Sequence, residues 1–281
     1  MRRMPQSFLC GLIGAGIQGS RTPCMHEQEA AAQGLQYVYR KIDLDELKLG
    51  VEALPELLTA AERMGYTGLN ITYPCKQAIL PLLHELSEEA RAIGAVNTVV
   101  LKHGKRTGYN TDCAGFAAGF RRALAHVKTD RVVQLGAGGA GAAAARAAIA
   151  ELGIGQLTIF DLDPAKSMQL AAKLGPRAKH GENLPAAMAE ADGLIHCTPT
   201  GMSNLPGLPL PAKLLRPSHW VAEIVYVPLE TELLKAARDT GCRIADGSGM
   251  AVFQAAGTFK LFTGIEPDID RMFRHFASMG S

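Results

Sequence analysis

Apolar runs alternate with helical segments through the second half of the chain. Short β-prone runs recur, and the residues between them carry apolar positions at helical spacing or begin with a helix-starting proline or threonine. The expected strands are 132–135, 157–160, 193–198, 220–226 and 243–245, and the expected helices between them include 164–174 and 231–240. This alternation predicts a parallel sheet with crossover helices.

The first half mixes strands and helices in a different order. Strands are expected at 8–13 and 69–72, with a hairpin from 96–101 to 106–109. The expected helices are 54–64, 77–84 with a kink or break at Pro81, 87–93, and 115–125 capped by Asp112. Two last helical stretches, 250–262 and 269–279, have no strand left to pair with, so we expect them to return to the first domain.

These patterns predict an α/β protein of two domains. Residues 1–113 form an N-terminal α/β substrate domain that the C-terminal helices 250–281 complete, and residues 114–249 form a Rossmann-type doubly wound parallel-sheet domain. The chain has 281 residues, a length that fits either one large domain or two, so the pattern decides between them.

A glycine fingerprint opens the predicted Rossmann domain. The strand 132–135 breaks into Gly136-Ala137-Gly138-Gly139-Ala140-Gly141 and then into an alanine-rich helix. Such a turn offers backbone N–H groups to a pyrophosphate, and the next strand ends at Asp161, where a carboxylate would meet a ribose hydroxyl. A glycine-rich turn without a ligand is the alternative, and the strand-turn-helix-strand-acid order argues against it.

A second Gly-x-Gly-x-x-Gly pattern lies near the N-terminus, at Gly14 to Gly19. Here the helix signal, Thr22-Pro23, comes several residues after the glycines, whereas a dinucleotide turn starts its helix within them. The loop before it suits a small carboxylate better than a pyrophosphate. If this run were nevertheless the nucleotide site, Asp43 rather than Asp161 would be the acid that cofactor binding needs.

Composition narrows the class of protein. Hydrophobic residues make up 47% and charged residues 20%, and 29 Lys and Arg nearly balance 27 Asp and Glu, so no global field attracts nucleic acid or an anionic membrane. The six cysteines are dispersed and no His pair has metal-ligand spacing, so we expect reduced thiols, no metal and a cytoplasmic protein. The apolar run behind the basic N-terminus is too short for a signal sequence or a membrane span.

Lys76 and Asp112 are the candidate catalytic pair. Each follows a predicted strand, and hydride removal from an alcohol also requires the hydroxyl proton to leave, so a positioned base is needed. Burial would lower the lysine pKa from about 10.4 and an adjacent aspartate would raise it, so the pair could be a proton relay or an electrostatic clamp. A surface lysine and a helix-capping aspartate are the plainer alternative. Neutral hydrogen-bonding residues near predicted strand ends add an ensemble that suits a hydroxylated carboxylic acid: Ser20, Thr22, Asn70, Thr72, Asn97 and Gln254.

Several motifs together resemble the shikimate/quinate dehydrogenase family over nearly the whole chain. They are Ser20-Arg21-Thr22-Pro23, Asn70 to Lys76, Ala95-Val96-Asn97-Thr98, Gly108 to Phe116, the glycines from Gly136 to Gly141, Thr198-Pro199-Thr200-Gly201-Met202, and Gln254. The resemblance implies oxidation of a ring 3-hydroxyl to a ketone in a cleft between two domains, with Lys76 and Asp112 as the catalytic pair.

The resemblance also implies roles for individual positions. Ser20 and Thr22 would hold the substrate carboxylate, Thr72, Asn97 and Gln254 would bind ring hydroxyls, and Tyr226 would lie near the substrate. The cofactor-binding set would be Gly136, Ala137, Gly138, Gly139, Ala140, Asp161, Asp163, Thr198 and Gly249.

Three departures from the family pattern refine this hypothesis. NADP-using members resemble one another in an Asn-Arg-Thr segment where this chain has Asp161-Leu162-Asp163, and two carboxylates would repel a 2′-phosphate, so NAD is the expected cofactor. Thr22 stands where many members have a second serine, which resembles members that accept quinate. Glu223 stands where many members have aspartate, and the sequence gives this no consequence.

We therefore expect an NAD-dependent dehydrogenase of shikimate, quinate or both, acting as a monomer or homodimer on a small hydroxylated carboxylic acid. A family member acting on an aminated analogue shares every motif. A ligand-sensing protein on the same scaffold is a third reading, which the presence of both Lys76 and Asp112 disfavours.

Overall fold

Two six-stranded sheets organise the protein, whose structure is a computed structural model that describes residues 6–279. The chain divides into two compact units. The first comprises the described residues up to Thr111 together with those from Gln254 onward, and the second is Asp112–Phe253. The predicted fold class is confirmed, including the return of the C-terminal helices to the first unit.

The sheet of the first unit is mixed. Its strands are β1 (Ser7–Gly14), β2 (Gln36–Asp43), β3 (Gly68–Ile71), β4 (Glu85–Leu86), β5 (Thr98–Lys102) and β6 (Lys105–Tyr109), in the order β2-β1-β3-β5-β6-β4. Strands β1, β2 and β3 are parallel, whereas β5 is antiparallel to β3 and β6 to β5. The carboxyl ends of β1, β3 and β6 and the start of β5 therefore share one edge.

Helices cover both faces of this sheet. They are α1 (Thr22–Ala32), α2 (Leu44–Leu47), α3 (Leu54–Arg63), α4 (Cys75–Ala78), α5 (Glu88–Ile93), the end of α11 (Ser248–Thr263) and α12 (Ile269–Ser278). Ile13 and Leu69 pack with Leu54 and Leu58 of α3 on one face. On the other face, Cys10 and Leu12 of β1 pack with Phe262 of α11, because neighbouring residues of a strand point to opposite sides.

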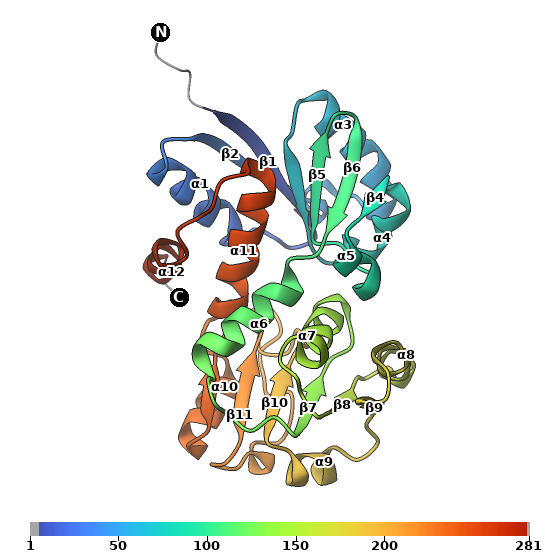
Figure 1. Cartoon of the computed structure of the whole chain (residues 1–281), viewed down its shortest axis with the longest axis vertical. Helices are drawn as coiled ribbons and strands as arrows, with labels where there is room; N and C mark the ends of the chain where they lie inside the picture. The colour runs from blue at the N-terminus through green and yellow to red at the C-terminus, as the bar shows by residue number, and fades with distance from the viewer. Residues whose placement is uncertain (1–5, 280–281) are drawn as a thin grey trace. The chain divides into compact units, whose positions relative to one another are not determined.

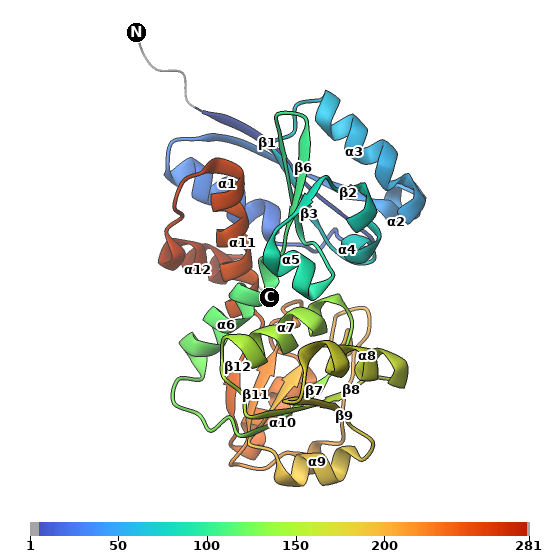
Figure 2. The same ribbon diagram turned by 45° about the vertical axis from the view of Figure 1, so that its right-hand side comes forward.

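An ion pair with a buried carboxylate joins α12 to α1. Arg271 donates from Nε and Nη2 to the Glu29 carboxylate at 2.8 and 2.7 Å, and the backbone N–H of Asp268 adds a bond of 2.9 Å. Glu29 is fully buried, and these donors hold the pKa of its carboxyl below the usual range against the opposing effect of burial. Figures 1 and 2 show α12 beside α1, at opposite ends of the colour bar.

The second unit has an all-parallel sheet in the order β12-β11-β10-β7-β8-β9. The strands are β7 (Arg131–Leu135), β8 (Gln156–Phe160), β9 (Ala178–His180), β10 (Gly193–His196), β11 (Trp220–Glu223) and β12 (Arg243–Ala245). The helices are α6 (Asp112–Ala123), α7 (Gly139–Ala150), α8 (Pro164–Leu174), α9 (Leu184–Glu190), α10 (Glu232–Thr240) and the start of α11. The chain leaves β7 toward β8 and β9 and returns to β10 on its other side, so the strand order reverses between β7 and β10.

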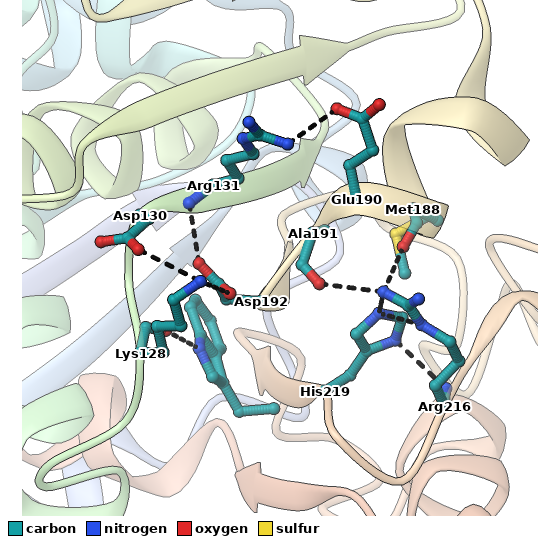
Figure 3. A network of polar contacts seen from close by, with 10 residues as sticks. Lys128, Asp130, Arg131, Met188, Glu190, Ala191, Asp192, Arg216 and His219 are labelled. Carbon is teal, nitrogen blue, oxygen red and sulfur yellow. Dashed lines mark hydrogen bonds and ion pairs between the residues drawn. The ribbon is translucent and has the colours of Figure 1, made fainter.

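Polar contacts fasten the amino ends of these strands. The Asp192 carboxylate accepts the backbone N–H of Arg131 at 2.9 Å and pairs with Lys128 at 3.2 Å, while Arg131 pairs with Glu190 at 3.0 Å (Figure 3). Arg216 donates to the backbone carbonyl oxygens of Met188 and Ala191 at the end of α9. These contacts lie at the edge opposite the glycine fingerprint, and they position α9 on the sheet.

Some predicted elements differ from the structure. The helix expected at 77–84 is a single turn, α4, followed by a 3₁₀ turn at Leu80–Leu82, because Pro81 cannot continue the α-helical bonding. Helix α6 starts at Asp112 itself, so Asp112 is its first residue and not a cap before 115. Strand β9 and helix α9 were not predicted, although Asn183 caps α9 and Pro185 lies in its first turn.

Buried His26 should make the protein sensitive to acid. Burial among the rings of Tyr37, Tyr39 and Phe259 lowers the pKa of His26 to about 3. In the unfolded chain the His26 ring takes up a proton near pH 6.5, whereas in the folded protein it does so only near pH 3. The contribution of this group to the free energy of unfolding is therefore fully present above pH 6.5 and falls as the pH drops toward 3. At pH 5 the loss from this group should be about 2 kcal/mol.

The test compares urea unfolding of the parent protein and His26→Leu at pH 7.5 and pH 5. The variant should lose some stability at both pH values, because Tyr37 loses its 2.9 Å hydrogen bond to the ring, but its pH-dependent change should be smaller by about 2 kcal/mol. Exposed His103, changed to Asn, is the control and should leave the pH dependence as it is. Equal pH dependence in the parent and His26→Leu would contradict the assignment.

Candidate active site

Candidate substrate residues gather at one edge of the first sheet. Ser20 and Thr22 follow β1, Thr72 and Lys76 follow β3, and Asn97 precedes β5, which starts at the edge where β3 ends. Residues far apart in the sequence thus meet at this edge because β5 runs antiparallel to β3. We refer to these five residues as the edge cluster.

Backbone hydrogen bonds hold the edge loops against one another. The N–H of Ala15 donates to the Tyr73 carbonyl at 2.9 Å, and that of Thr72 donates to the Ile13 carbonyl at 2.9 Å. The carbonyl of Lys76 accepts from Val96 N–H at 2.9 Å. Each of the three loops is therefore held by a neighbouring one.

Asn97 has a defined orientation in this edge. Its side-chain oxygen accepts the backbone N–H of Thr111 and the hydroxyl of Thr98, both at 2.9 Å, and its Nδ2 donates to Thr111 Oγ1 at 2.9 Å. Because the oxygen accepts two bonds and the nitrogen donates one, the orientation of the amide is fixed. Thr111 directly precedes Asp112, so the same bonds fix the end of β6.

Asn70 has a structural role. It is buried, its side-chain oxygen accepts from the Tyr39 hydroxyl at 2.7 Å, and its Nδ2 faces Asn97 O, Thr98 Oγ1 and Thr258 Oγ1 at 3.1–3.3 Å. These bonds join α11 to the sheet beneath the edge cluster. The sequence placed Asn70 among possible ligand groups, and its bonds to Tyr39 and Thr258 are what give it a structural role.

Thr22 is the first residue of α1 rather than its cap. The cap position is Arg21, which makes no side-chain capping bond, and Thr22 N–H lies 3.4 Å from Ser20 Oγ. The two hydroxyls thus lie at the N-terminus of an eleven-residue helix, where the helix dipole favours an anion.

Lys76 and Asp112 belong to different units. Lys76 is half-buried in α4 of the first unit, and Asp112 is buried as the first residue of α6, where the second unit begins. Gln254 lies on α11 at the point where the first unit resumes. Tyr226 follows β11 in the second unit and is half-buried.

The first glycine run does not offer its N–H groups to a phosphate. The Asp43 carboxylate at the end of β2 accepts the N–H groups of Gly16 and Ile17 at 2.9 and 3.0 Å, and also the Gln18 side-chain amide at 3.0 Å. The helix starts only at Thr22. An internal carboxylate thus already occupies the place an anion would take, which argues against a nucleotide site there.

The second glycine run has the geometry of a dinucleotide turn. Gly136 has φ +100°, and a Cβ there would lie 2.6 Å from the carbonyl oxygen of Cys197, while a Cβ on Gly141 would lie 2.3 Å from the Gly136 oxygen. At Gly138, by contrast, no described atom lies within 4 Å of an added Cβ. Gly136 and Gly141 are thus required by packing, and Gly138 leaves open space at the N-terminus of α7, where Gly139 and Ala140 form the first turn.

Gln134 braces this turn from below, a role that the sequence did not reveal. Its Nε2 donates to the carbonyl oxygens of Gly136 and Gly141 at 2.8 and 2.9 Å, and the side chain is fully buried. A polar residue inside an otherwise apolar strand is the signal that could have found it.

The two acids after β8 behave differently. Asp161 accepts the N–H of Ala137 at 2.7 Å and that of Asp163 at 2.9 Å, so its carboxylate is held beside the glycine turn. Asp163 is exposed and caps α8 by accepting Ala165 N–H at 3.0 Å. Local capping accounts for Asp163, whereas the contact of Asp161 with the turn joins residues 24 apart.

Thr198 and Gly249 also lie in the second unit. Thr198 follows β10 with its methyl group against Gly136, 3.2 Å from an added Cβ. Gly249 packs against Gly119 of α6, whose Cα would be 2.8 Å from a Cβ at Gly249. Close helix packing therefore requires Gly249 to be small, whatever else it contacts.

Other kinds of site find little support in residues 6–279. In this part of the chain no group of three His, Cys, Asp or Glu side chains could hold a metal ion, and no helix has the length and apolar character to cross a bilayer. The six cysteines, all within it, are unbridged. A cavity of about 310 Å³ lies on the α9 face of the second sheet, lined by residues such as Val133, Phe160 and Asn183.

Comparisons with known proteins agree with this geometry. A family model described as the shikimate dehydrogenase substrate binding domain matches residues 12–99. A Streptomyces avermitilis protein named "Shikimate dehydrogenase (NADP(+))" is 52% identical over 97% of this chain and 96% of its own length. A Corynebacterium efficiens protein named "Quinate/shikimate dehydrogenase (NAD(+))" is 48% identical, covering 97% and 99%. The solved "Quinate dehydrogenase from Corynebacterium glutamicum in complex with NAD" superposes with a TM-score of 0.90 at 46% identity, covering 97% and 99% of the two chains.

Proposed function

Since this chain belongs to the shikimate/quinate dehydrogenase family of oxidoreductases, we propose that it oxidises the 3-hydroxyl of shikimate, quinate or both with NAD. The first unit would bind the substrate and the second the dinucleotide. The observation that carries the substrate assignment is the edge cluster, which offers hydroxyl, amide and ammonium groups at one edge of the sheet, beside the N-terminus of α1.

The edge cluster fits a ring acid with several hydroxyls. Ser20 and Thr22 would hold the carboxylate at the start of α1, and Thr72, Asn97 and Gln254 would bind ring hydroxyls. Tyr226 would complete the substrate contacts. The methyl group of Thr22, in place of a second serine, supports acceptance of quinate as well as shikimate.

Lys76 and Asp112 would handle the proton. When the alcohol carbon gives up its hydride, the hydroxyl loses its proton to this pair, and the reverse transfer accompanies ketone reduction. NAD, when bound, supplies the hydride acceptor. The bonds between Asn97 and Thr111 support the placement of Asp112 after β6, and the bond that the Lys76 carbonyl accepts from Val96 N–H supports that of Lys76.

The second glycine run fits the dinucleotide. Its open position at Gly138 and the N-terminus of α7 suit a pyrophosphate, and Ala137, Gly139 and Ala140 complete the turn. Thr198 and Gly249 would lie near the nicotinamide. The acids Asp161 and Asp163 support NAD, because they would repel a 2′-phosphate while Asp161 can still accept bonds from ribose hydroxyls.

The decisive experiment crosses shikimate and quinate with NAD and NADP on the purified protein. We expect turnover with NAD and at least one of the two acids, and a higher kcat/KM with NAD than with NADP. Turnover with NADP alone would contradict the cofactor assignment, and no turnover in any of the four combinations would contradict the proposed reaction.

Asp161→Asn should shift the cofactor preference. Removing the charge weakens the bonds to ribose hydroxyls and the repulsion of a phosphate, so KM for NAD should rise about tenfold and KM for NADP should fall. Asp163→Ser keeps the cap of α8 and removes the second charge, so it should lower KM for NADP with less effect on NAD. Asp130→Ala, at the opposite end of β7, is the control, and an Asp161→Asn protein with unchanged preference would refute the role of Asp161.

A further inference from the structure

A buried histidine–glutamate pair ends two neighbouring strands of the second sheet. His196 is the last residue of β10 and Glu223 the last of β11, and the two are directly opposite in register. Both side chains are completely buried, and His196 Nδ1 lies 2.8 and 2.9 Å from the two carboxylate oxygens. Neither residue has a part in the substrate or cofactor contacts proposed above.

The Glu223 carboxylate is fixed from three directions. Besides the histidine, Oε1 accepts the N–H of Val225 at 2.9 Å and Oε2 accepts the hydroxyl of Thr231 at 3.1 Å. Thr231 in turn caps α10 by accepting Leu234 N–H at 3.2 Å. An ionised carboxylate can only accept, so His196 Nδ1 carries its proton toward Glu223 and the orientation of the ring is set.

The far side of the ring contacts a residue of the proposed cofactor site. His196 Nε2 lies 2.5 Å from Thr198 Oγ1, which also accepts Thr200 N–H at 3.3 Å. The Thr198 methyl group in turn packs against Gly136 of the dinucleotide turn. A chain of contacts thus runs from the start of α10 through Glu223 and His196 to the side chain beside the first glycine.

Stability alone does not explain such a pair. Replacing a buried ion pair or polar pair by apolar residues of similar volume is often neutral or stabilising, because the polar groups lose their hydration. A pair of this kind does supply a fixed direction for its hydrogen bonds. The position of this pair, beside the reversal of strand order between β7 and β10, is where open parallel sheets bind their ligands.

We propose that His196 is a positioning residue for the cofactor: held by Glu223, it fixes the Thr198 side chain against the dinucleotide turn. The inference rests on the proposed function, in which Thr198 contacts the nicotinamide dinucleotide. It assigns a role to Glu223, which the sequence left without one.

The test uses a substitution that keeps the hydrogen bond of residue 196 to Glu223 and removes the one to Thr198. In His196→Asn the amide lies where Nδ1 was and still donates to Glu223, but nothing reaches Thr198. We expect the dissociation constant for NAD, measured by calorimetry, to rise about five- to tenfold, the size of one hydrogen bond. KM for NAD should rise in parallel, while kcat and KM for shikimate stay close to the parent values.

Thr198→Val should give the same loss, and the double variant His196→Asn/Thr198→Val should be no worse than either single one. Thr240→Val is the matched control, because it removes a threonine hydroxyl in α10 that bonds the Ala236 carbonyl. Parent-like NAD affinity in His196→Asn, additive losses in the double variant, or an equal loss in Thr240→Val would each overturn the proposal.

If His196→Asn does not fold, the paired replacement His196→Leu with Glu223→Met removes the ring and the charge together. It should bind NAD as weakly as Thr198→Val, and parent-like affinity would overturn the proposal. Calorimetry also separates the two hypotheses. A parent protein that binds NAD but oxidises neither acid contradicts the proposed reaction alone, whereas normal turnover with unaltered affinity in His196→Asn contradicts the positioning role alone.

Discussion

Replacing Lys76 by alanine is expected to lower kcat for shikimate or quinate oxidation about 10²- to 10⁴-fold, the usual contribution of a positioned acid or base. The variant loses the side-chain amine that would take the hydroxyl proton, or the ammonium that would stabilise the alkoxide, while the dinucleotide turn in the other unit is untouched. Asp112→Asn should lower kcat in the same sense. Steady-state kinetics with NAD, together with calorimetric NAD binding, measures both effects.

Two further variants make this prediction specific. Lys76→Arg keeps a positive charge that cannot be given up near neutral pH, so a proton relay would lose activity in it and an electrostatic clamp would keep much of it. The exposed Lys105, which pairs with Glu85, is changed to alanine as the control and should retain full activity. If Lys76→Ala and Asp112→Asn both turn over like the parent protein, the catalytic pair lies elsewhere.

The second large expected effect concerns the glycine turn, where one substitution should weaken NAD binding and leave the stability of the unliganded protein unchanged. Gly138 has ordinary extended backbone (φ −72°, ψ −170°) and open space around an added Cβ, so Gly138→Ala should leave the unliganded protein as stable as the parent. The same methyl group would block the approach of the pyrophosphate, so the dissociation constant for NAD should rise on the order of 10- to 100-fold. Thermal unfolding without ligand and calorimetry with NAD measure the two quantities.

Gly141→Ala is the matched comparison. Its Cβ would lie 2.3 Å from the carbonyl oxygen of Gly136, so the turn must shift, and the unliganded protein should lose about 1–3 kcal/mol of stability as well as affinity. A Gly138→Ala protein that binds NAD like the parent would show that the pyrophosphate does not approach this turn. If Gly138→Ala lost as much stability as Gly141→Ala, the space around a Cβ at position 138 would not be open.

The two glycine runs show the limits of sequence reasoning. Both fit Gly-x-Gly-x-x-Gly, and the position of the following helix start favoured the second run as the dinucleotide site. The physical distinction is a set of contacts. In the first run, Asp43 accepts the N–H groups of Gly16 and Ile17. In the second, Asp161 accepts the N–H of Ala137, and no described atom lies within 4 Å of an added Cβ at Gly138. Such a contact depends on where two strands end side by side, which a local pattern does not contain.

Local physics determined much of the secondary structure. Residues 164–174 carry the apolar spacing, first-turn proline and terminal glycine of a helix, and α8 has these bounds. The hairpin from 96–101 to 106–109 is likewise present as β5 and β6. Strand β9 was missed because an edge strand of three residues is too short for a period to appear.

By itself, the sequence determined the fold class, the order of most elements and the family motifs, because periodicity, caps and glycine turns are encoded within a few residues of one another. Only the tertiary structure decided which polar side chains are hydrogen-bonded to one another. It bonded Asn70 to Thr258 inside the first unit, held Asp161 beside the glycine turn, and joined His196 and Glu223 from two strands. These pairings span up to 188 residues, and strand register, which no local pattern specifies, brings their partners together.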